Sequence, residues 1–459
     1  MTLASRVADN PESLIEDGTA VTEDMVARCF AGIYARQLAY CHSRGAWFEF
    51  DGSTWKRHLK PVAFQYIRDM CRRLSARVKN GGSLQKLKFM SAIETLSQKE
   101  RVFSRDASFW DADPMLLGTP GGTVDLRTGS LRQSRPEDAI TKSVSVIPDD
   151  YEDCPTWHQF LEEACAGDHA LVRFLQQVAG YCLTGLTTEQ ALFFIYGTGG
   201  NGKGVFIGAV QGILADYAQT AGMEMLEKQK FASHSTDLAA LAGARAVIAA
   251  ETEEGSDWNG KRVKQMTGGD RIKARFMRQD EFEYAPQFKL LISGNHEPSL
   301  QSVDDAMRRR FNIIPFVNTP KKQDLNLPDK LKSEWPGILR WMINGCLDWQ
   351  RNGLVRPDVV LRATQDYFDD QNTIQQWLDE LCVVEPDNTH LQATSTDLFK
   401  SWSAFARSNG LEPGTTKTFK PAMERSGYRL KKTSRANIYL GIELRANLRR
   451  DEADDDPFR

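Results

Sequence analysis

The 459-residue sequence predicts an α/β fold, and a few features of residues 191–317 carry that prediction. Three apolar segments, 191–196, 245–250 and 288–292, have the length of buried β-strands, and helical patterns alternate with them. The first segment runs into a glycine-rich turn that ends in Gly-Lys. Strands that alternate with helices form a parallel sheet, whose ligands bind at the carboxyl ends of the strands. We therefore expect a binding site directly after residue 196.

The glycine-rich turn has the G-x-x-x-x-G-K pattern of a P-loop. Glycines allow such a turn to point its backbone N–H groups inward around phosphates, and the lysine ammonium reaches the β- and γ-phosphates. The helix predicted after it, with Val205, Phe206, Ile207, Val210 and Ile213 at helical spacing, adds a positive N-terminal end. The sequence thus predicts nucleotide binding by Gly197, Thr198, Gly199, Gly200, Asn201, Gly202, Lys203 and Gly204.

One position departs from the pattern, because the residue after Lys203 is Gly204 and not the Ser or Thr that holds Mg²⁺. Mg²⁺ keeps several waters in most protein sites, and a water can take the place of the missing hydroxyl. The strand 245–250 runs into Glu251, which we expect nearest the metal, with Glu253 or Glu254 as the alternative for orienting the attacking water. A solvated acidic loop is the competing interpretation.

Two further features fit phosphate chemistry. The strand 288–292 ends in Ser-Gly-Asn295, whose amide can hydrogen-bond the attacking water or the γ-phosphate, although an asparagine here is equally typical of a left-handed turn. Arg309 and Arg310 precede the apolar residues 313–316. Such a run is usually a solvated helix face, but in ring-shaped ATPases an arginine of one subunit stabilises the transition state in the next, and this run could supply it.

A basic hairpin is predicted between the second and third strands. Apolar Ile272, Ala274 and Phe276 alternate with Lys273 and Arg275. Cations interleaved with an aromatic residue suit a loop that follows a DNA strand, although a polar hairpin face would show the same alternation. The residues expected to contact DNA here are Lys264, Lys273, Arg275 and Arg278.

The composition is that of an ordinary soluble protein, with a formal net charge of −3 and eight scattered cysteines without a C-x-x-C pair. We expect the cysteines to be buried apolar residues in a reducing compartment, and not a zinc site or a disulfide framework. No apolar run is long enough to cross a bilayer, and the N-terminus has no signal pattern. A cytoplasmic protein that makes no membrane contact is therefore expected.

The regions on either side carry local signals. Residues 1–20 and the acidic tail 446–459 are predicted to be disordered. A helix is expected after Thr22, a hairpin turned at Asp51-Gly52, two helices within 60–104, a second hairpin over 123–132 and helical structure over 157–183.

The C-terminal region predicts two helices, near 395–409 and 416–426, and a basic hairpin over 428–442. This order resembles a winged-helix domain, a duplex-binding module. A small protein-contact domain is the alternative, because no base-reading residue can be assigned. The cations expected to contact DNA are Lys431, Lys432 and Arg435.

The chain resembles the phage and plasmid primase-helicase family, superfamily-three helicases of the poxvirus type. Five motifs carry this resemblance, in the order Gly-Thr-Gly-Gly-Asn-Gly-Lys, Arg-Ala-Val-Ile-Ala-Ala-Glu-Thr-Glu-Glu-Gly, Thr-Gly-Gly-Asp-x-Ile-x-Ala-Arg, Gly-Asn-x-x-Pro and Arg-Arg-Phe-x-Ile-Ile-Pro-Phe. Residues 47–55, the hairpin at 124–129 and Cys-Pro-x-Trp at 154–157 resemble the N-terminal helicase-associated domain of that family.

The resemblance implies an N-terminal helicase-associated domain of mostly helical α+β structure (21–150) and an AAA+-like ATPase core (151–350), and the C-terminal pattern adds the winged-helix domain (360–445). It implies a homo-hexameric ring that hydrolyses ATP with Mg²⁺ and translocates on single-stranded DNA during replication of a phage or mobile element, in the cytoplasm of a bacterial host. By this resemblance Lys203 binds phosphate, Glu251 serves the metal, Asn295 is the sensor, and Arg309 or Arg310 is the finger.

Other functions remain open. An ATP-dependent DNA-binding regulator or loader would share the core and the winged helix but would need no basic hairpin in a ring pore. A GTPase is disfavoured, because no Asn-Lys-x-Asp motif occurs. A primase activity has only the weak pair Asp111 and Asp113, so we interpret the chain as the helicase part, with a separate primase as a candidate partner.

Overall fold

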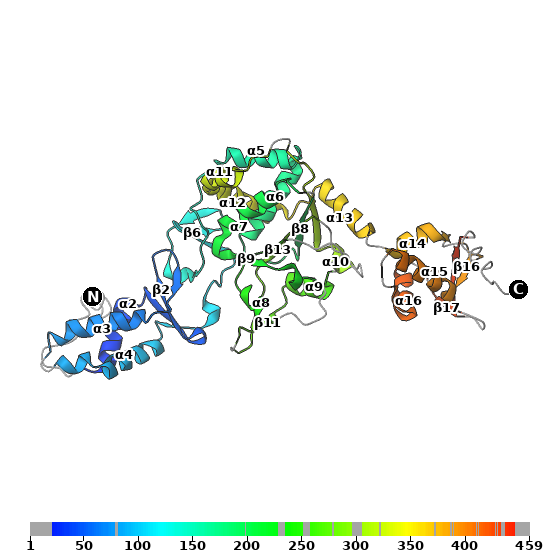
Figure 1. Cartoon of the computed structure of the whole chain (residues 1–459). Helices are drawn as coiled ribbons and strands as arrows, with labels where there is room; N and C mark the ends of the chain where they lie inside the picture. The colour runs from blue at the N-terminus through cyan, green and yellow to red at the C-terminus, as the bar shows by residue number, and fades with distance from the viewer. Residues whose placement is uncertain are drawn as a thin grey trace. The chain divides into compact units, whose positions relative to one another are not determined.

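The computed structural model describes residues 21–445 except for 79–80, 198, 228–234, 251–257, 278–279, 296–304, 321–322, 371–372, 386–387, 389, 410, 412, 427, 429 and 433–436 (Figure 1). The segments predicted to be disordered, 1–20 and 446–459, lie outside these residues. The chain divides into two compact units. The first runs to Pro298 and includes Arg309–Leu361, and the second comprises Ser299–Arg308 and Arg362–Arg459.

The first unit begins with a small sheet and three helices. Thr22 caps the first helix, because its side-chain oxygen accepts a hydrogen bond from the N–H of Met25 at 3.3 Å. The strands form a sheet in the order β3-β2-β1-β4, and the β2–β3 hairpin turns at Asp51-Gly52 as predicted. The elements are α2 (Glu23–Tyr34), β1 (Leu38–Cys41), β2 (Ala46–Phe50), β3 (Trp55–Arg57), α3 (Val62–Ser75), α4 (Leu87–Lys99) and β4 (Ser104–Arg105).

A three-stranded antiparallel sheet follows, with β5 (Leu116–Thr119), β6 (Gly122–Asp125) and β7 (Ser130–Arg132). The helical stretch predicted over 157–183 is in fact two helices, α5 (Pro155–Ala164) and α6 (His169–Cys182). The break lies at Ala166 and Gly167, which both have positive φ. Asp168 then caps α6 by accepting hydrogen bonds from the N–H groups of Ala170 and Leu171 at 2.9 and 3.0 Å.

The centre of this unit is a five-stranded sheet in the order β14-β8-β13-β10-β9, and every neighbouring pair in it is parallel. Its strands are β8 (Leu192–Tyr196), β9 (Ala218–Ala221), β10 (Ala246–Ala250), β13 (Lys289–Gly294) and β14 (Phe311–Pro315). The connecting elements are α7 (Lys203–Leu214), α8 (Ser235–Ala240), α9 (Gly260–Thr267), β11 (Ile272–Ala274) and β12 (Phe282–Tyr284). Two helices follow the sheet, α11 (Leu327–Ser333) and α12 (Trp335–Asn352). The parallel sheet expected from the sequence is therefore present.

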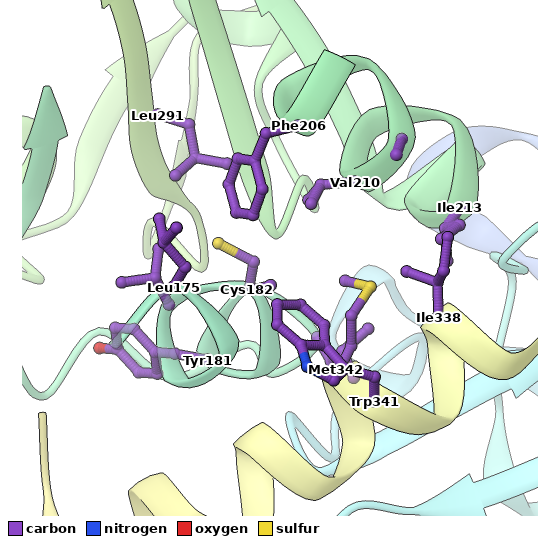
Figure 2. Packing of buried hydrophobic residues seen from close by; sticks show 14 of the residues in the cluster. Leu175, Tyr181, Cys182, Phe206, Val210, Ile213, Leu291, Ile338, Trp341 and Met342 are labelled. Carbon is purple, nitrogen blue, oxygen red and sulfur yellow. The ribbon is translucent and has the colours of Figure 1, made fainter. Parts of the chain in front are cut away.

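The main core lies between one face of this sheet and the helices α6, α7 and α12. Figure 2 shows Phe206 and Val210 of α7 and Leu291 of β13 facing Cys182 of α6 and Met342 of α12. The opposite face is also covered, since the ring of Phe194 in β8 contacts Trp258, just before α9. Burial on both faces explains why these strands are continuous apolar runs and do not alternate with polar residues.

The second unit contains helices and short strands. Its elements are α10 (Asp305–Arg308), most of α13 (Asp358–Asp370), α14 (Thr373–Leu381), β15 (Cys382–Val384), β16 (Gln392–Thr394), α15 (Ser395–Ser408), α16 (Thr416–Arg425), β17 (Leu430–Lys432), β18 (Asn437–Leu440) and β19 (Ile442–Leu444). The two helices and the hairpin predicted after residue 395 are present. The sequence analysis missed β16, which pairs with β18 and extends the hairpin to three strands.

All eight cysteines lie in the described part of the chain and are buried free thiols, as expected. No helix of the described residues is long and apolar enough to cross a membrane.

Candidate nucleotide and nucleic-acid sites

The glycine-rich loop, residues 197–202, lies between β8 and α7 at the carboxyl edge of the five-stranded sheet. Gly197, Gly200 and Gly202 have positive φ values of 151°, 80° and 90°. A Cβ atom at position 197 would lie 2.1 Å from the carbonyl oxygen of Phe316, so no other residue fits there without movement of the backbone. Thr198, predicted to bind nucleotide, is outside the described residues, and the rest of the predicted loop is at this edge.

Asn201 fixes the loop to the chain that follows the neighbouring strand β14. Its side chain is buried, and its Nδ2 donates a hydrogen bond to the carbonyl oxygen of Phe316. The sequence analysis assigned Asn201 to nucleotide binding alone. The structure adds a second contact for this amide, because its Oδ1 accepts a hydrogen bond from Lys203 Nζ at 3.2 Å.

Lys203 is the first residue of α7, and its ammonium group is turned back into the loop. The residue is only 6% exposed. Besides Asn201, its Nζ donates to the carbonyl oxygen of Gly197 at 2.5 Å and to Oδ1 of Asn295 at 3.2 Å. Burial lowers the pKa of Lys203, because desolvation disfavours the charged form. A phosphate entering the loop would meet a cation that is already in position.

Asn295 and Lys203 are 92 residues apart in sequence, and the parallel sheet brings them together. In the register of β8 and β13, Tyr196 pairs with Gly294, so the two strands end at the same level. β13 also pairs with β10, where Ala250 lies opposite Ser293. The next residue after Ala250 is Glu251, so the acidic segment leaves the sheet from the same edge. Glu251, Glu253 and Glu254 themselves are outside the described residues.

The surroundings of Gly204 bear on how Mg²⁺ would be held. A Cβ atom built at position 204 has no atom within 4 Å, so the space that a Ser or Thr side chain would take is open. No group of three metal-binding side chains occurs among the residues that the structure describes. The acidic residues predicted from the sequence to serve the metal lie in the segment 251–254, outside the described residues.

A cavity of about 1050 Å³ opens beside the loop. Gly202, Lys203, Gly204 and Gly208 line one side of it. The other walls come from α5, through Phe160, and from the chain entering α11 and α12. The sequence analysis missed these wall residues, which are Thr156, Gln159, Phe160, Glu163, Gln323, Leu325, Leu327 and Trp335. They belong to no local motif, and only the fold brings them to the loop.

The two candidate finger arginines have different surroundings. Arg310 is 6% exposed, and its guanidinium donates to Thr267 Oγ1 at 3.1 Å and to Gln190 Oε1 at 2.9 Å, both in its own chain. Arg309 is exposed. Both residues precede β14, so they lie at the amino edge of the sheet. The five residues of β14 separate that edge from the loop by about 16 Å.

The hairpin predicted between the second and third strands is present as β11 paired with β12. Ile272 and Ala274 are buried, and Lys273 and Arg275 are exposed. The basic edge is partly neutralised, because Glu283 on β12 lies 3.6 Å from Lys273 Nζ. Of the other predicted DNA contacts in this region, Lys264 lies half-buried on α9, and Arg278 is outside the described residues.

The hairpin also has features that the sequence analysis did not use. The rings of Phe276 and Phe282 stack at a centroid distance of 5.7 Å, and Met277 beside them is 76% exposed. Arg271 forms a second ion pair with Glu283 at 3.5 Å. A charge on the opposite strand is visible only once the pairing register is known.

Among the predicted wing cations, Lys431 is exposed on β17, and Lys432 is the last residue of the same strand. The side chain of Lys432 and the whole of Arg435 lie outside the described residues.

A glycine-rich loop thus lies at the carboxyl edge of a parallel α/β sheet, with the buried Lys203 directly after it. Residues 27–166 match the family described as D5 N terminal like, and residues 195–310 match a family of unknown function (DUF5906). The second match contains the loop, Lys203, Asn295 and both arginines.

Viral proteins are among the relatives of the chain. It is 25% identical over 324 residues to "Putative helicase L207/L206" of Acanthamoeba polyphaga mimivirus. The matched region covers 65% of this chain and 34% of the relative. Identity to "Putative helicase 022R" of Frog virus 3 is 22%, over 78% of this chain and 45% of the relative. "Primase D5" of Fowlpox virus is 24% identical over 32% of this chain and 20% of its own length. The chain thus spans less than half the length of these relatives.

Solved structures share the fold. The A form apo structure of the NrS-1 C-terminal region has a TM-score of 0.52 at 11% identity and covers 92% of this chain and 99% of its own. A second A form apo structure of that region has a TM-score of 0.51 at 10% identity, and the match covers 92% of this chain and 100% of the other. The match to the D5 N terminal like family and the similarity to these viral helicases and primase support assignment of the chain to the D5-like primase-helicase family.

Proposed function

We propose that the chain is an ATP-dependent DNA helicase that acts in replication of a phage or mobile element. In this proposal six copies form a ring that moves along single-stranded DNA. The observation that carries it is the 3.2 Å hydrogen bond between Lys203 Nζ and Asn295 Oδ1, which joins a phosphate-binding lysine to a polar residue at the end of the adjacent strand. A phosphate-binding lysine and an amide beside the γ-phosphate are the parts that phosphoryl transfer to water requires.

The chemistry assigns a role to each residue. Lys203 and the N–H groups of the glycine-rich loop and of the first turn of α7 bind the phosphates, and the cavity takes the rest of the nucleotide. The amide of Asn295 orients water or the γ-phosphate. Glu251, or alternatively Glu253, accepts the proton as water attacks the γ-phosphorus and the bond to the ADP oxygen breaks. Mg²⁺, held by the segment 251–254 and water, would neutralise charge on the phosphates.

The arginine finger is assigned to Arg309. Arg310 is buried and bonded within its own chain, so its role is to position this corner of the sheet. Because Arg309 lies at the edge opposite the loop, it is too far from the nucleotide of its own chain, and in this proposal it serves the nucleotide of a neighbour. This placement supports a ring in which each site lies between two subunits.

Mixed subunits test this arrangement. Lys203→Ala and Arg309→Ala chains are each expected to be inactive alone, and a mixture should regain ATP hydrolysis where an intact loop meets an intact arginine. Arg310→Ala serves as the comparison, since its main expected effect is a lower melting temperature. No recovery at any mixing ratio, with rings still visible by negative-stain electron microscopy, would contradict a role in trans.

The alternative function is a DNA-binding regulator or loader that hydrolyses ATP without unwinding, and the exposed cations on β11 and β17 suit it equally. Unwinding of a forked duplex separates the two proposals. Lys273→Ala should reduce unwinding and single-strand-stimulated hydrolysis, whereas Glu283→Gln, which releases Lys273 and Arg271 from their carboxylate, should increase single-strand affinity. If wild-type rings bind DNA and hydrolyse ATP but never separate the fork, the regulator is favoured.

A further inference from the structure

Positive charge is concentrated in a part of the chain to which no function has been assigned above. Residues 56–101, here called the basic helical hairpin, contain twelve lysines and arginines and three aspartates and glutamates, a net charge of +9 in a chain of net charge −3. They include α3 and α4, which pack against each other (Figure 1). Lys79 is outside the described residues. The exposed cations are Lys56, Arg57, Lys60, Arg72, Arg73, Arg77, Lys86, Lys88, Lys99 and Arg101.

The three acidic residues do little to offset this charge. Asp69 pairs with Arg72 at 3.6 Å, on the surface of α3. Glu94 is half-buried and accepts a hydrogen bond from Trp47 Nε1 at 3.2 Å. Burial raises the pKa of Glu94. Glu100 is the C-cap of α4 and is half-buried.

The turn between the helices brings together the cations at the end of α3 and those at the start of α4. The 3₁₀ helix η3 (Gly81–Gln85) folds back on the end of α3, where Gln85 Nε2 donates to Ser75 Oγ at 2.6 Å. Leu84 in this turn is buried and anchors it. The last turn of α3, which carries Arg72 and Arg73, therefore lies beside the first turn of α4, whose N-cap is Lys86.

The first turn of α4 is arranged against helix stability. Lys86 is its N-cap and makes no side-chain capping bond, Lys88 follows, and the first turn has no acidic residue. Cations at a helix N-terminus are repelled by the positive end of its dipole. Leu87 between them is 68% exposed. Residues that destabilise the local structure in this way are typical of functional sites.

We propose that the basic helical hairpin binds the phosphate backbone of duplex DNA without reading its sequence. Clustered exposed cations are the footprint of a polyanion, and phosphates carry most of the affinity in such contacts. Single-strand binding uses exposed aromatic rings as stacking platforms. Among the described residues of 56–101, the large apolar side chains that are exposed are leucines, and no aromatic ring is among them. A duplex therefore fits this surface better than a single strand.

The test needs no ATP, so it can fail or succeed independently of the proposed helicase activity. Fluorescence anisotropy of a 30-base-pair duplex is measured with the full chain and with the Lys86→Gln/Lys88→Gln variant. We expect about tenfold weaker duplex binding at 0.1 M salt and a salt slope smaller by roughly two. The melting temperature should stay constant or rise, because the substitutions relieve repulsion at the start of α4.

A matched control removes two exposed cations elsewhere. Arg28→Gln/Arg351→Gln makes the same change in net charge and should leave duplex affinity within about twofold. Equal losses in both double variants would show a general charge effect and overturn the proposal. So would unchanged duplex affinity in Lys86→Gln/Lys88→Gln, or a larger loss for single-stranded DNA than for duplex. Loss of binding to phosphatidylserine vesicles with duplex affinity retained would assign the surface to a membrane instead.

Discussion

Two buried lysines occupy opposite edges of the same sheet, and their surroundings differ. Lys203, at the carboxyl edge, is turned into a glycine-rich loop beside a large cavity. Lys289, the first residue of β13 at the amino edge, is 2% exposed and donates to the carbonyl oxygens of Thr184, Leu186 and Gln287. Its Nζ also lies 4.7 Å from the ring centre of Tyr181.

The two lysines differ in whether a ligand can replace the oxygens that accept their hydrogen bonds. The oxygens around Lys289 belong to the chain that follows α6, at Thr184 and Leu186, and to Gln287 just before β13, and the amine satisfies these buried carbonyls. Protein encloses this lysine on all sides. Lys203 borders open space, so a phosphate can replace the oxygens that now hold it. Burial of a cation therefore indicates a binding function only where a cavity adjoins it.

The largest expected effect separates the two lysines by activity. Lys203→Ala should lower ATP hydrolysis by roughly 10²–10³-fold, because it removes the cation at the phosphates. Lys289→Ala should keep its rate per folded molecule. Steady-state hydrolysis, corrected for folded fraction by circular dichroism, measures both. Equal losses in the two variants would remove the basis of the comparison.

Stability should show the reverse order. Lys289→Ala leaves three buried carbonyl oxygens without their donor and creates a cavity, so the free energy of unfolding should fall by about 2–4 kcal/mol. Lys203 borders an existing cavity, so Lys203→Ala should change the free energy of unfolding by less than about 1 kcal/mol. Urea denaturation measures both changes. A Lys203→Ala variant destabilised as much as Lys289→Ala would indicate a structural lysine.

The amino-edge lysine should also make stability depend on pH. Burial lowers the pKa of Lys289 from 10.5 to about 7 in the folded chain. Below pH 7 both states are protonated, and this group contributes no slope. Above pH 7 the unfolded chain holds a proton that the folded chain has released, so the free energy of unfolding rises with pH. The difference between wild type and Lys289→Met should therefore shift in favour of wild type from pH 7 to 8.5, and a constant difference would contradict this.

The smallest effect is expected at Gly204. A serine there meets open space and is a better helix former, so Gly204→Ser should raise stability by about 0.5 kcal/mol and leave nucleotide binding intact. Thermal shift with and without ATP and Mg²⁺ measures both. If nucleotide no longer raises the melting temperature of this variant, the space over Gly204 holds something that a hydroxyl displaces.

The sequence predicted the strands of the sheet that are continuous apolar runs, β8, β10 and β13, together with the turn glycines. It missed β9, because Ala-Gln-Thr-Ala lacks an apolar run and is an edge strand that is recognised only by its pairing with β10. The break between α5 and α6 was also missed. Ala166 takes a positive φ there, which residue type alone does not indicate.

For the candidate site, local pattern singled out Lys203 and Asn295, which the structure brings within hydrogen-bonding distance, although their predicted roles stay predictions. It could not choose between Arg309 and Arg310, because adjacent residues share every sequence feature and differ only in which side chain packs inward. The cavity walls from α5 and α11 were beyond sequence reasoning, because they depend on how distant helices cover the loop. Similarly, the ion pair of Lys273 with Glu283 depends on strand register.

The separation of Arg309 from the glycine-rich loop by the length of β14 has a kinetic consequence. A chain whose finger and loop face opposite ways has an incomplete site when it is alone, so on our proposal hydrolysis per chain would depend steeply on protein concentration. Dilute chains would consume little ATP, and turnover would begin only where copies gather. The direction of the five-residue strand β14 would thereby make ATP hydrolysis depend on assembly of the ring.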